Sequence, residues 1–302
     1  FGSLKRAGVF RQECRLEDGR VLNGEGQRAT ARLDDAAARA QLLQHCTARQ
    51  LSGGVLAHGG FLLGPRGFYA ALRDMPEPER RQFQMNAISY INDLQGPQAE
   101  LKYAQRRDAR FINSTMMAHL LGASTADGLA DGRVVSGVGG QYNFVAMAHA
   151  LPGARSILAL RSTRIDARGE LRSNMVWNYA HTTIPRHLRD IIVTEYGIAD
   201  LRGRTEEQVI AALLEVSDSR FQESLRLEAV RSGKLDPAYR IGEAHRDNLP
   251  GTLQRRFTLS RARGLFSEFP FGTDLTRQEV ELARALTRLK QATARRGPAL
   301  RA

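Results

Sequence analysis

The stretch RDIIVTEYGIADLRG, residues 189–203, holds an apolar run of strand length between polar and glycine residues. A second run of this kind, RSILALRST, occupies residues 155–163. Continuous apolar runs are typical of strands that are buried on both faces, and such strands belong to parallel sheets. After the first stretch, Thr205 is a good N-cap for a helix with acidic residues in its first turn. The pattern predicts an α/β fold, an open and mostly parallel sheet with helices on both faces.

The rest of the chain continues the alternation of strands and helices. Strands are expected within residues 53–64 and 83–93, and a helix begins near Pro65. Residues 110–112 read as a strand that runs into a helix with Asn113 or Ser114 as its N-cap. The composition changes from Pro250 onward, where an irregular, Phe-rich stretch precedes a final helix that begins near Thr276. We therefore predict a main α/β domain over residues 1–245 and a helical extension over residues 246–302.

Composition excludes several classes of function. The net charge is +12, but arginine outnumbers lysine about tenfold and is scattered along the whole chain, without interleaved aromatic residues, so we expect no nucleic-acid partner. No apolar run approaches the ~20 residues that span a bilayer, so we expect no membrane partner. Cys14 and Cys46 have neither metal-ligand spacing nor the pattern of a disulfide framework, which predicts a cytoplasmic protein without a metal site.

Glycines gather in RVVSGVGGQYNF, residues 133–144, where three of them fill four positions. The stretch is neither a Walker A loop nor a G-x-G-x-x-G fingerprint. It is either a tight turn or a place where a ligand approaches the backbone closely. Gly197 lies in a second glycine-containing segment that follows a buried strand. In open α/β sheets ligands bind beyond the carboxyl ends of the strands, which favours a ligand here.

Three separated motifs, FINSTMM, VSGVGGQYNF and VTEYGIADLRGRT, together resemble the acetyl-CoA hydrolase/transferase family, which includes 4-hydroxybutyrate and succinyl-CoA:acetate CoA-transferases. The resemblance extends loosely from Phe1 to about Lys290 and is strongest between Phe111 and Thr205. It implies that residues 1–245 are the second of two CoA-transferase-like α/β domains, truncated at the N-terminus. The chain begins with Phe1 and looks cut from a longer one, so the first domain of the same polypeptide is expected to be missing.

The resemblance also implies a reaction, either acyl-CoA:carboxylate CoA transfer or acetyl-CoA hydrolysis. In the family a glutamate carboxylate attacks the thioester and forms a glutamyl-CoA intermediate. FGSLKRAGVF, residues 1–10, resembles the end of the segment that follows this glutamate, so the nucleophile is expected upstream of Phe1 and the fragment alone is expected to be inactive. The alternative is a non-catalytic module that binds CoA esters or serves as a scaffold. The resemblance implies that coenzyme A takes part as a substrate and that no cofactor is needed. The identity of the small carboxylate acceptor stays open, and a homodimer is possible.

The family pattern assigns roles to residues of this chain. Backbone N–H groups of Gly139 and Gly140 would form an oxyanion hole. Glu195 is a second catalytic candidate, although a carboxylate after a buried strand is as often bound by neighbouring N–H groups. Asn113 resembles the family's asparagine near the acyl group, with helix capping as the competing role. The remaining substrate-binding candidates are Gly137, Gln141, Asn143 and Gly197; Asn143 departs from the aspartate common in the family.

Overall fold

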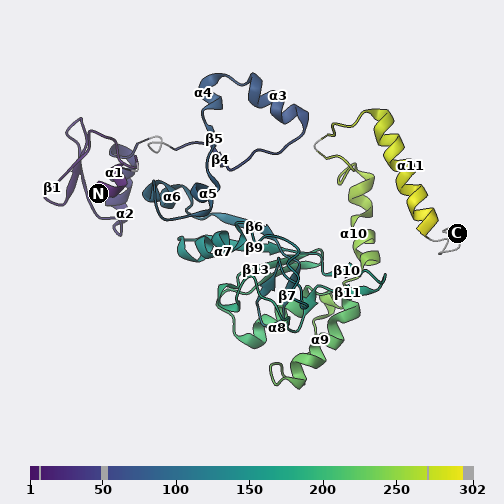
Figure 1. Cartoon of the computed structure of the whole chain (residues 1–302). Helices are drawn as coiled ribbons and strands as arrows, with labels where there is room; N and C mark the ends of the chain where they lie inside the picture. Colours follow the sequence, from purple (N-terminus) through teal and green to yellow (C-terminus); the bar gives the residue numbers. More distant parts are fainter. Residues whose placement is uncertain (7, 49–53, 271, 295–302) are drawn as a thin grey trace.

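The computed structural model describes residues 1–6, 8–48, 54–270 and 272–294. Its centre is a four-stranded sheet in the order β14-β13-β9-β6 (Figure 1). The strands are β6 (Arg110–Ser114), β9 (Arg155–Ala159), β13 (Ile191–Thr194) and β14 (Gly197–Asp200). β6, β9 and β13 run parallel, and β14 returns antiparallel to β13. The mostly parallel α/β class predicted from the sequence is confirmed.

Two helices pack on this sheet and build its core. Helix α7 (Gln141–Ala150) contacts β6 and β9, and helix α8 (Glu206–Glu215) contacts β14. Leu158, Ile192 and Ala199 are neighbours on three adjacent strands. They belong to a buried hydrophobic cluster that also contains residues of α7 and α8. Thr205 caps α8 as expected, in a capping box with Gln208.

The helix expected after Asn113 or Ser114 is wrong. The chain instead forms β7 (Met117–His119), which lies between β8 (Ser124–Thr125) and β12 (Met175–Val176) in a second small sheet. All three residues of β7 are buried, and the backbone N–H of Ala118 donates to the carbonyl of Asn174 (3.0 Å). A strand buried on both faces has no alternating pattern, so its apolar run reads like a helix.

The strand expected over residues 83–93 is only partly confirmed. β5 (Phe83–Met85) pairs in parallel with β4 (Ala57–Gly59), and residues 88–92 form helix α5 (Ile88–Asn92). The expected strand within residues 53–64 corresponds to β4, and Gly53 lies outside the described residues. Helix α3 (Arg66–Asp74) begins directly after Pro65, as expected. Helix α11 (Arg277–Ala294) begins after Thr276, also as expected.

The N-terminal residues form a small unit with a core of its own. Its elements are α1 (Gly2–Arg6), β1 (Arg15–Glu17), β2 (Arg20–Leu22), β3 (Arg28–Thr30) and α2 (Ala36–His45). Buried Cys14, Val21, Leu42 and Cys46 pack together within it. The remaining elements are α4 (Glu77–Arg80), α6 (Ala99–Gln105), β10 (Thr163–Ile165), β11 (Leu171–Ser173), η1 (Arg186–Leu188), α9 (Ser219–Arg231), η2 (Glu243–His245) and α10 (Pro250–Ala262). The domain boundary at residue 245 stays a prediction.

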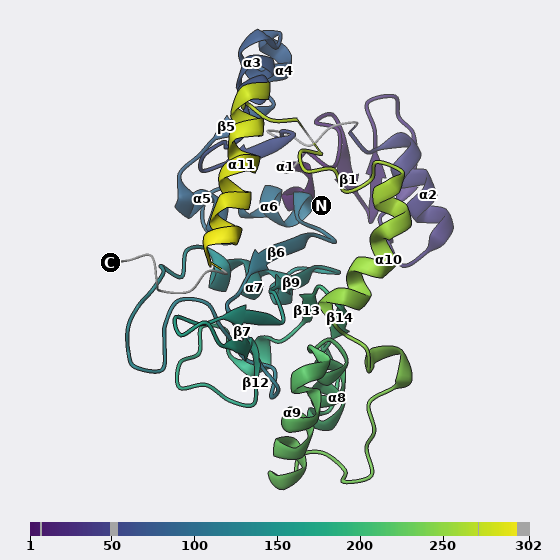
Figure 2. The same cartoon turned by 90° about the vertical axis from the view of Figure 1, so that its right-hand side faces the viewer.

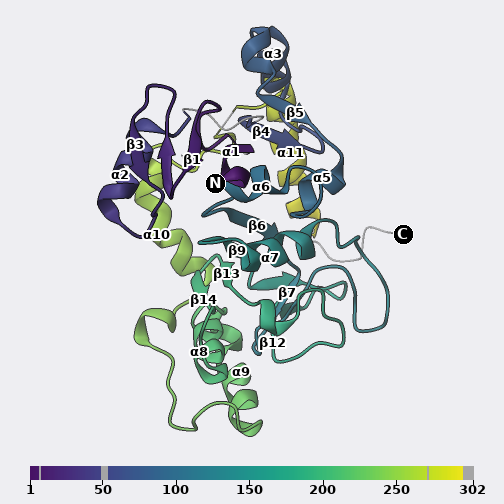
Figure 3. The ribbon, with the colours of Figure 1, turned by 90° about the vertical axis from the view of Figure 1, so that its left-hand side faces the viewer.

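The molecule is spread out around its central sheet. The N-terminal unit, the α3–α4 pair and the α10–α11 pair project from the body (Figures 2 and 3). The accessible surface is 19736 Å², whereas a compact monomer of this mass exposes roughly 12,700 Å². The glycine motif and both apolar runs of the sequence lie in the body.

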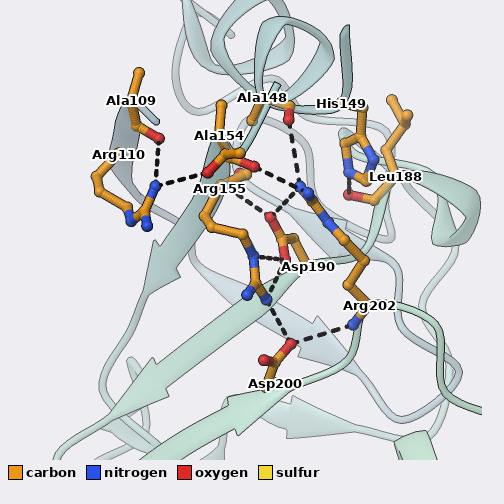
Figure 4. A network of polar contacts seen from close by, with 12 residues as sticks. Ala109, Arg110, Ala148, His149, Ala154, Arg155, Leu188, Asp190, Asp200 and Arg202 are labelled. Atoms are coloured by element: carbon orange, nitrogen blue, oxygen red, sulfur yellow. Dashed lines mark hydrogen bonds and ion pairs between the residues drawn. The ribbon is translucent and has the colours of Figure 1, made fainter. Parts of the chain in front are cut away.

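A network of ion pairs ties the amino-terminal ends of the central strands together (Figure 4). Asp190 is 4% exposed; its Oδ1 accepts from Arg155 Nε (2.8 Å), and its Oδ2 accepts from the backbone N–H of Ser156 (2.7 Å) and from Arg202. Arg202 also donates to the carbonyls of Ala154 (2.9 Å) and Ala148 (3.3 Å). Since Ala148 lies in the last turn of α7, this network anchors α7 to β9 and β13.

Candidate active site

The glycine loop leads directly into helix α7. Gly140 is the N-cap of α7, and Gly139 adopts a φ of +60°, which favours glycine. Within the described chain the backbone N–H groups of Gly139 and Gly140 donate to no acceptor. The loop therefore presents free N–H groups at a helix N-terminus, where the helix dipole favours negative charge.

The Asn92 side chain lies against Gly140. A Cβ built on Gly140 would lie 2.8 Å from Asn92 Nδ2 and 2.9 Å from Oδ1. Asn92 is the last residue of α5, 48 positions before Gly140, and nothing in the sequence connected the two. The absent side chain of Gly140 thus leaves room for a carboxamide, which adds an N–H donor beside the backbone donors of the loop.

Asn113 lies near the end of strand β6, and Gln141 is bound to the last residue of that strand. Gln141 Nε2 donates to the backbone carbonyl of Ser114 (2.9 Å), which fixes the start of α7 on β6. Asn113 Nδ2 and Gln141 Oε1 are both buried, and neither has a hydrogen-bond partner among the described residues. Buried polar atoms are nearly always paired, so Nδ2 of Asn113 and Oε1 of Gln141 are available to a ligand or to water. The capping role considered for Asn113 is excluded because Asn113 lies inside a strand.

Glu195 lies in the two-residue turn between β13 and β14, at the carboxyl edge of the parallel strands. Its Oε2 accepts from the backbone N–H of Ser162 (2.8 Å), and its Oε1 accepts from Ser162 Oγ (2.7 Å). The next residue, Tyr196, donates its hydroxyl to Asp218 (2.9 Å), and burial raises the pKa of that phenol well above its usual range. Both contacts stabilise the turn. The two oxygens of the Glu195 carboxylate accept hydrogen bonds from a single residue, Ser162.

The other candidates lie in different surroundings. Gly137 has open space where a Cβ would stand, and Asn143 is exposed in the first turn of α7. A Cβ on Gly197 would lie 3.3 Å from Val216, so this glycine permits close packing of the hairpin on the core. The structure thus places Gly140 and Gln141 at the start of α7, beside the end of the strand that carries Asn113, while Gly197 lies on the hairpin that carries Glu195. Their roles in binding stay predictions.

The start of α7 is bound to the end of β6, and Glu195 follows β13, so the glycine loop and the turn glutamate lie at the same carboxyl edge of the parallel strands. The family model for the acetyl-CoA hydrolase/transferase C-terminal domain matches residues 64–229, more than half of the chain. The chain belongs to the acetyl-CoA hydrolase/transferase family. The matched range contains every candidate site residue named above, Asn92 included.

Similarity to individual proteins covers part of each chain. The 4-hydroxybutyrate coenzyme A transferase of Clostridium kluyveri is 28% identical over 168 residues, 56% of this chain and 36% of the relative. A probable butyrate:acetyl-CoA coenzyme A-transferase of Syntrophomonas wolfei is 32% identical over 142 residues, 46% of this chain and 31% of the relative. The crystal structure of RipA from Yersinia pestis covers 59% of this chain and 37% of its own, with 28% identity and a TM-score of 0.48. The chain thus spans about a third of the length of the curated relatives it matches.

Two residues of the site were missed from the sequence. Asn92 approaches Gly140 only in three dimensions, and Ser162 follows β9 at an ordinary loop position. The sequence offered one indication for Ser162: it follows the apolar run of β9, the strand that pairs with β13. Across the described residues there is no group of three His, Cys, Asp or Glu side chains arranged to hold a metal ion. In the same residues no helix has the length and apolarity needed to cross a membrane.

Proposed function

We propose that this chain supplies the thioester-binding site for CoA transfer between an acyl-CoA and a small carboxylate, or for acyl-CoA hydrolysis. The contact between the Asn92 carboxamide and Gly140, at the N-terminus of α7, is the observation that carries the proposal. Such a cluster of donors suits an oxygen that becomes negatively charged. Buried free cysteines fit a cytoplasmic enzyme of acyl-CoA or acetate metabolism.

The proposed reaction proceeds through a glutamyl-CoA thioester. A glutamate carboxylate oxygen bonds to the acyl carbon, the C–S bond breaks, and the CoA thiolate leaves. The thiolate then attacks the glutamyl carbonyl of the anhydride and releases the carboxylate of the donor. The acceptor carboxylate attacks the glutamyl-CoA thioester and releases CoA thiolate, which then attacks the acyl carbon of the new anhydride to give the product acyl-CoA and free glutamate. In hydrolysis, water attacks the glutamyl-CoA thioester instead and releases CoA and free glutamate. Each attack places negative charge on a former carbonyl oxygen, which Asn92 Nδ2 and the N–H groups of Gly139 and Gly140 would stabilise.

Glu195 is proposed as a positioning residue and not as the nucleophile. Both of its oxygens already accept hydrogen bonds from Ser162, which lowers their nucleophilicity. After incubation of this chain with acetyl-CoA and butyrate, we expect mass spectrometry to find no CoA adduct on Glu195. Borohydride, which reduces a glutamyl thioester, should leave that side chain intact. A CoA adduct at Glu195 would identify it as the nucleophile and contradict this assignment.

Asn113 is proposed to bind the acyl-CoA through its unpaired Nδ2. Asn113→Leu keeps the approximate shape and removes a buried donor that has no partner, so the free chain should gain about 1 kcal/mol in its free energy of unfolding. Acetyl-CoA affinity should fall about tenfold, because the bound ligand loses a donor. Urea unfolding and calorimetric titration measure the two effects. If the Leu variant is destabilised and still binds acetyl-CoA normally, Asn113 has a structural role and does not bind the ligand.

The function itself is tested by binding and by transfer. This chain should bind acetyl-CoA in a calorimetric titration, and a protein of the relatives' full length should transfer CoA from acetyl-CoA to butyrate or 4-hydroxybutyrate. Binding without transfer or hydrolysis in the longer protein would favour the non-catalytic alternative. Absence of acetyl-CoA binding at millimolar concentration would contradict both.

A further inference from the structure

A strongly basic pocket lies at the amino-terminal edge of the central sheet. Its lining consists of His149, Arg186, His187, Arg189, Arg202, Gly203, Arg204 and Glu206. Half of these residues are arginine, whereas lysine and arginine together make up 44 of the 302 residues of the chain. The fraction of arginine in the pocket lining is thus higher than in the chain as a whole. The lining residues come from α7, from η1 and from the start of α8.

Part of the positive charge in the pocket is already neutralised. Arg202 donates to Asp190, in the network that anchors α7 (Figure 4). Glu206 pairs with Arg186 (2.9 Å) and with Lys234 (2.6 Å), and the hydrogen bond from Lys234 lowers the pKa of that carboxyl. The only carboxylate of the lining is thus shared between two cations.

Among the described residues, Arg189 and Arg204 form no ion pair within 4 Å. Arg189 donates one N–H, from Nη2, to the backbone carbonyl of Arg204 (2.8 Å). The Arg204 guanidinium donates to no acceptor in the part of the chain that the structure describes. The backbone N–H groups of Glu206 and Glu207, at the N-terminus of the ten-residue helix α8, are also free of acceptors there. Arg189, Arg204 and Glu206, the first residue of α8, line the same pocket.

The pocket is separate from the proposed thioester site. Asp190 and Arg189 precede strand β13, whereas Glu195 follows it. A strand advances about 3.3 Å per residue, so Asp190 and Glu195, five positions apart, are separated by roughly 16 Å. An anion in this pocket would not contact the reacting carbonyl.

We propose that this pocket binds a small phosphate-bearing anion, with Arg189 and Arg204 as its main ligands. The planar guanidinium presents paired N–H donors that match phosphate oxygens, and the free N–H groups of α8 add donors where the helix dipole favours an anion. The ligand is either an inorganic anion or the phosphate group of a nucleotide, since both carry the same oxygens.

Pyrophosphate is the probe for a calorimetric test on the complete chain at about 150 mM salt, where long-range surface attraction is screened. Arg204→Ala should weaken pyrophosphate binding at least tenfold, and Arg189→Gln, which keeps a donor for the Arg204 carbonyl, should do the same. Arg204→Lys should restore only part of the affinity because the paired donors are lost. The melting temperature of Arg204→Ala should not change, since this side chain holds no partner.

The matched control is Arg256→Ala, which removes an exposed arginine of α10 and should leave binding unchanged. Tighter binding of adenosine diphosphate than of pyrophosphate would indicate a nucleotide as the ligand, and equal affinities would indicate the inorganic anion; both agree with the proposal. An equal loss in the Arg204→Ala and Arg256→Ala variants would overturn it, because binding would then follow net charge alone. Absence of pyrophosphate binding at about 10 mM, where even a very weak charge-assisted site is occupied, would overturn it as well.

Discussion

Gly140→Ala should lower CoA-transferase turnover about 10²-fold in a protein of the relatives' full length, with little change in stability. The added Cβ would lie 2.8 Å from Asn92 Nδ2, so the carboxamide must move. Asn92 and the backbone N–H groups beside it are the proposed donors to the oxyanion. Because these donors act mainly in the transition state, turnover should fall more than the affinity for acyl-CoA.

The backbone of Gly140 explains why stability should be spared. Its φ of −88° and ψ of 3° are open to alanine, so the variant carries no backbone strain. Gly139 is the opposite case, with a φ of +60° and open space around a new Cβ. Gly139→Ala should therefore lose about 1 kcal/mol of stability and leave Asn92 in place.

A double-mutant cycle tests whether Gly140→Ala acts through Asn92. Asn92→Ala removes the proposed donor and also the obstacle to the new Cβ, so the double variant should be no slower than Asn92→Ala alone. Gly67→Ala, in open space on helix α3 and outside the proposed site, serves as the control with normal turnover. Additive losses, or unchanged turnover in a folded Gly140→Ala protein, would reject the assignment of the oxyanion site to this contact.

The elements that the sequence predicted correctly have local signals. The apolar runs of β9 and β13 are bounded by polar residues, and Thr205 with Gln208 forms a capping box within four residues. The glycine cluster predicted either a turn or a ligand approach, and the turn at the start of α7 is observed. Such features depend on neighbours along the chain, which a sequence displays directly.

The features that the sequence did not predict depend on distant contacts. Strand β7 is buried because β12, more than fifty residues later, pairs with it, and the helical reading of residues 113–121 contained no sign of this pairing. Asn92 approaches Gly140 across 48 residues, and the role of α5 in the site follows from that contact alone. Glu195 could be placed at the end of a strand, but its partner Ser162 belongs to the loop after a neighbouring strand.

Asp190→Ala should destabilise the protein by about 3–5 kcal/mol, the largest stability effect that we expect in this chain. Asp190 is buried and accepts hydrogen bonds from Arg155, from Arg202 and from the backbone N–H of Ser156. Removal of the carboxylate leaves the Ser156 N–H without its acceptor, Arg155 with Asp200 as its remaining ion-pair partner, and Arg202 with backbone carbonyls alone. Such a loss is a large part of the ~5–15 kcal/mol that stabilises a typical domain. The melting temperature should fall by roughly 10 °C, as measured by circular dichroism.

Asp200→Ala is the matched control, since Asp200 pairs with the same Arg155 but has a side chain that is 48% exposed. An exposed pair contributes at most about 1 kcal/mol, so this variant should melt within a few degrees of the original protein. Asp190→Asn retains one acceptor oxygen and should fall between the two. If Asp190→Ala melts like Asp200→Ala, the network does not hold the strands. Arg202 binds both Asp190 and the carbonyl of Ala148, so the loss of Asp190 should also weaken the attachment of α7 to the sheet. Because the glycine loop lies at the other end of α7, we expect its geometry to depend on this carboxylate as well.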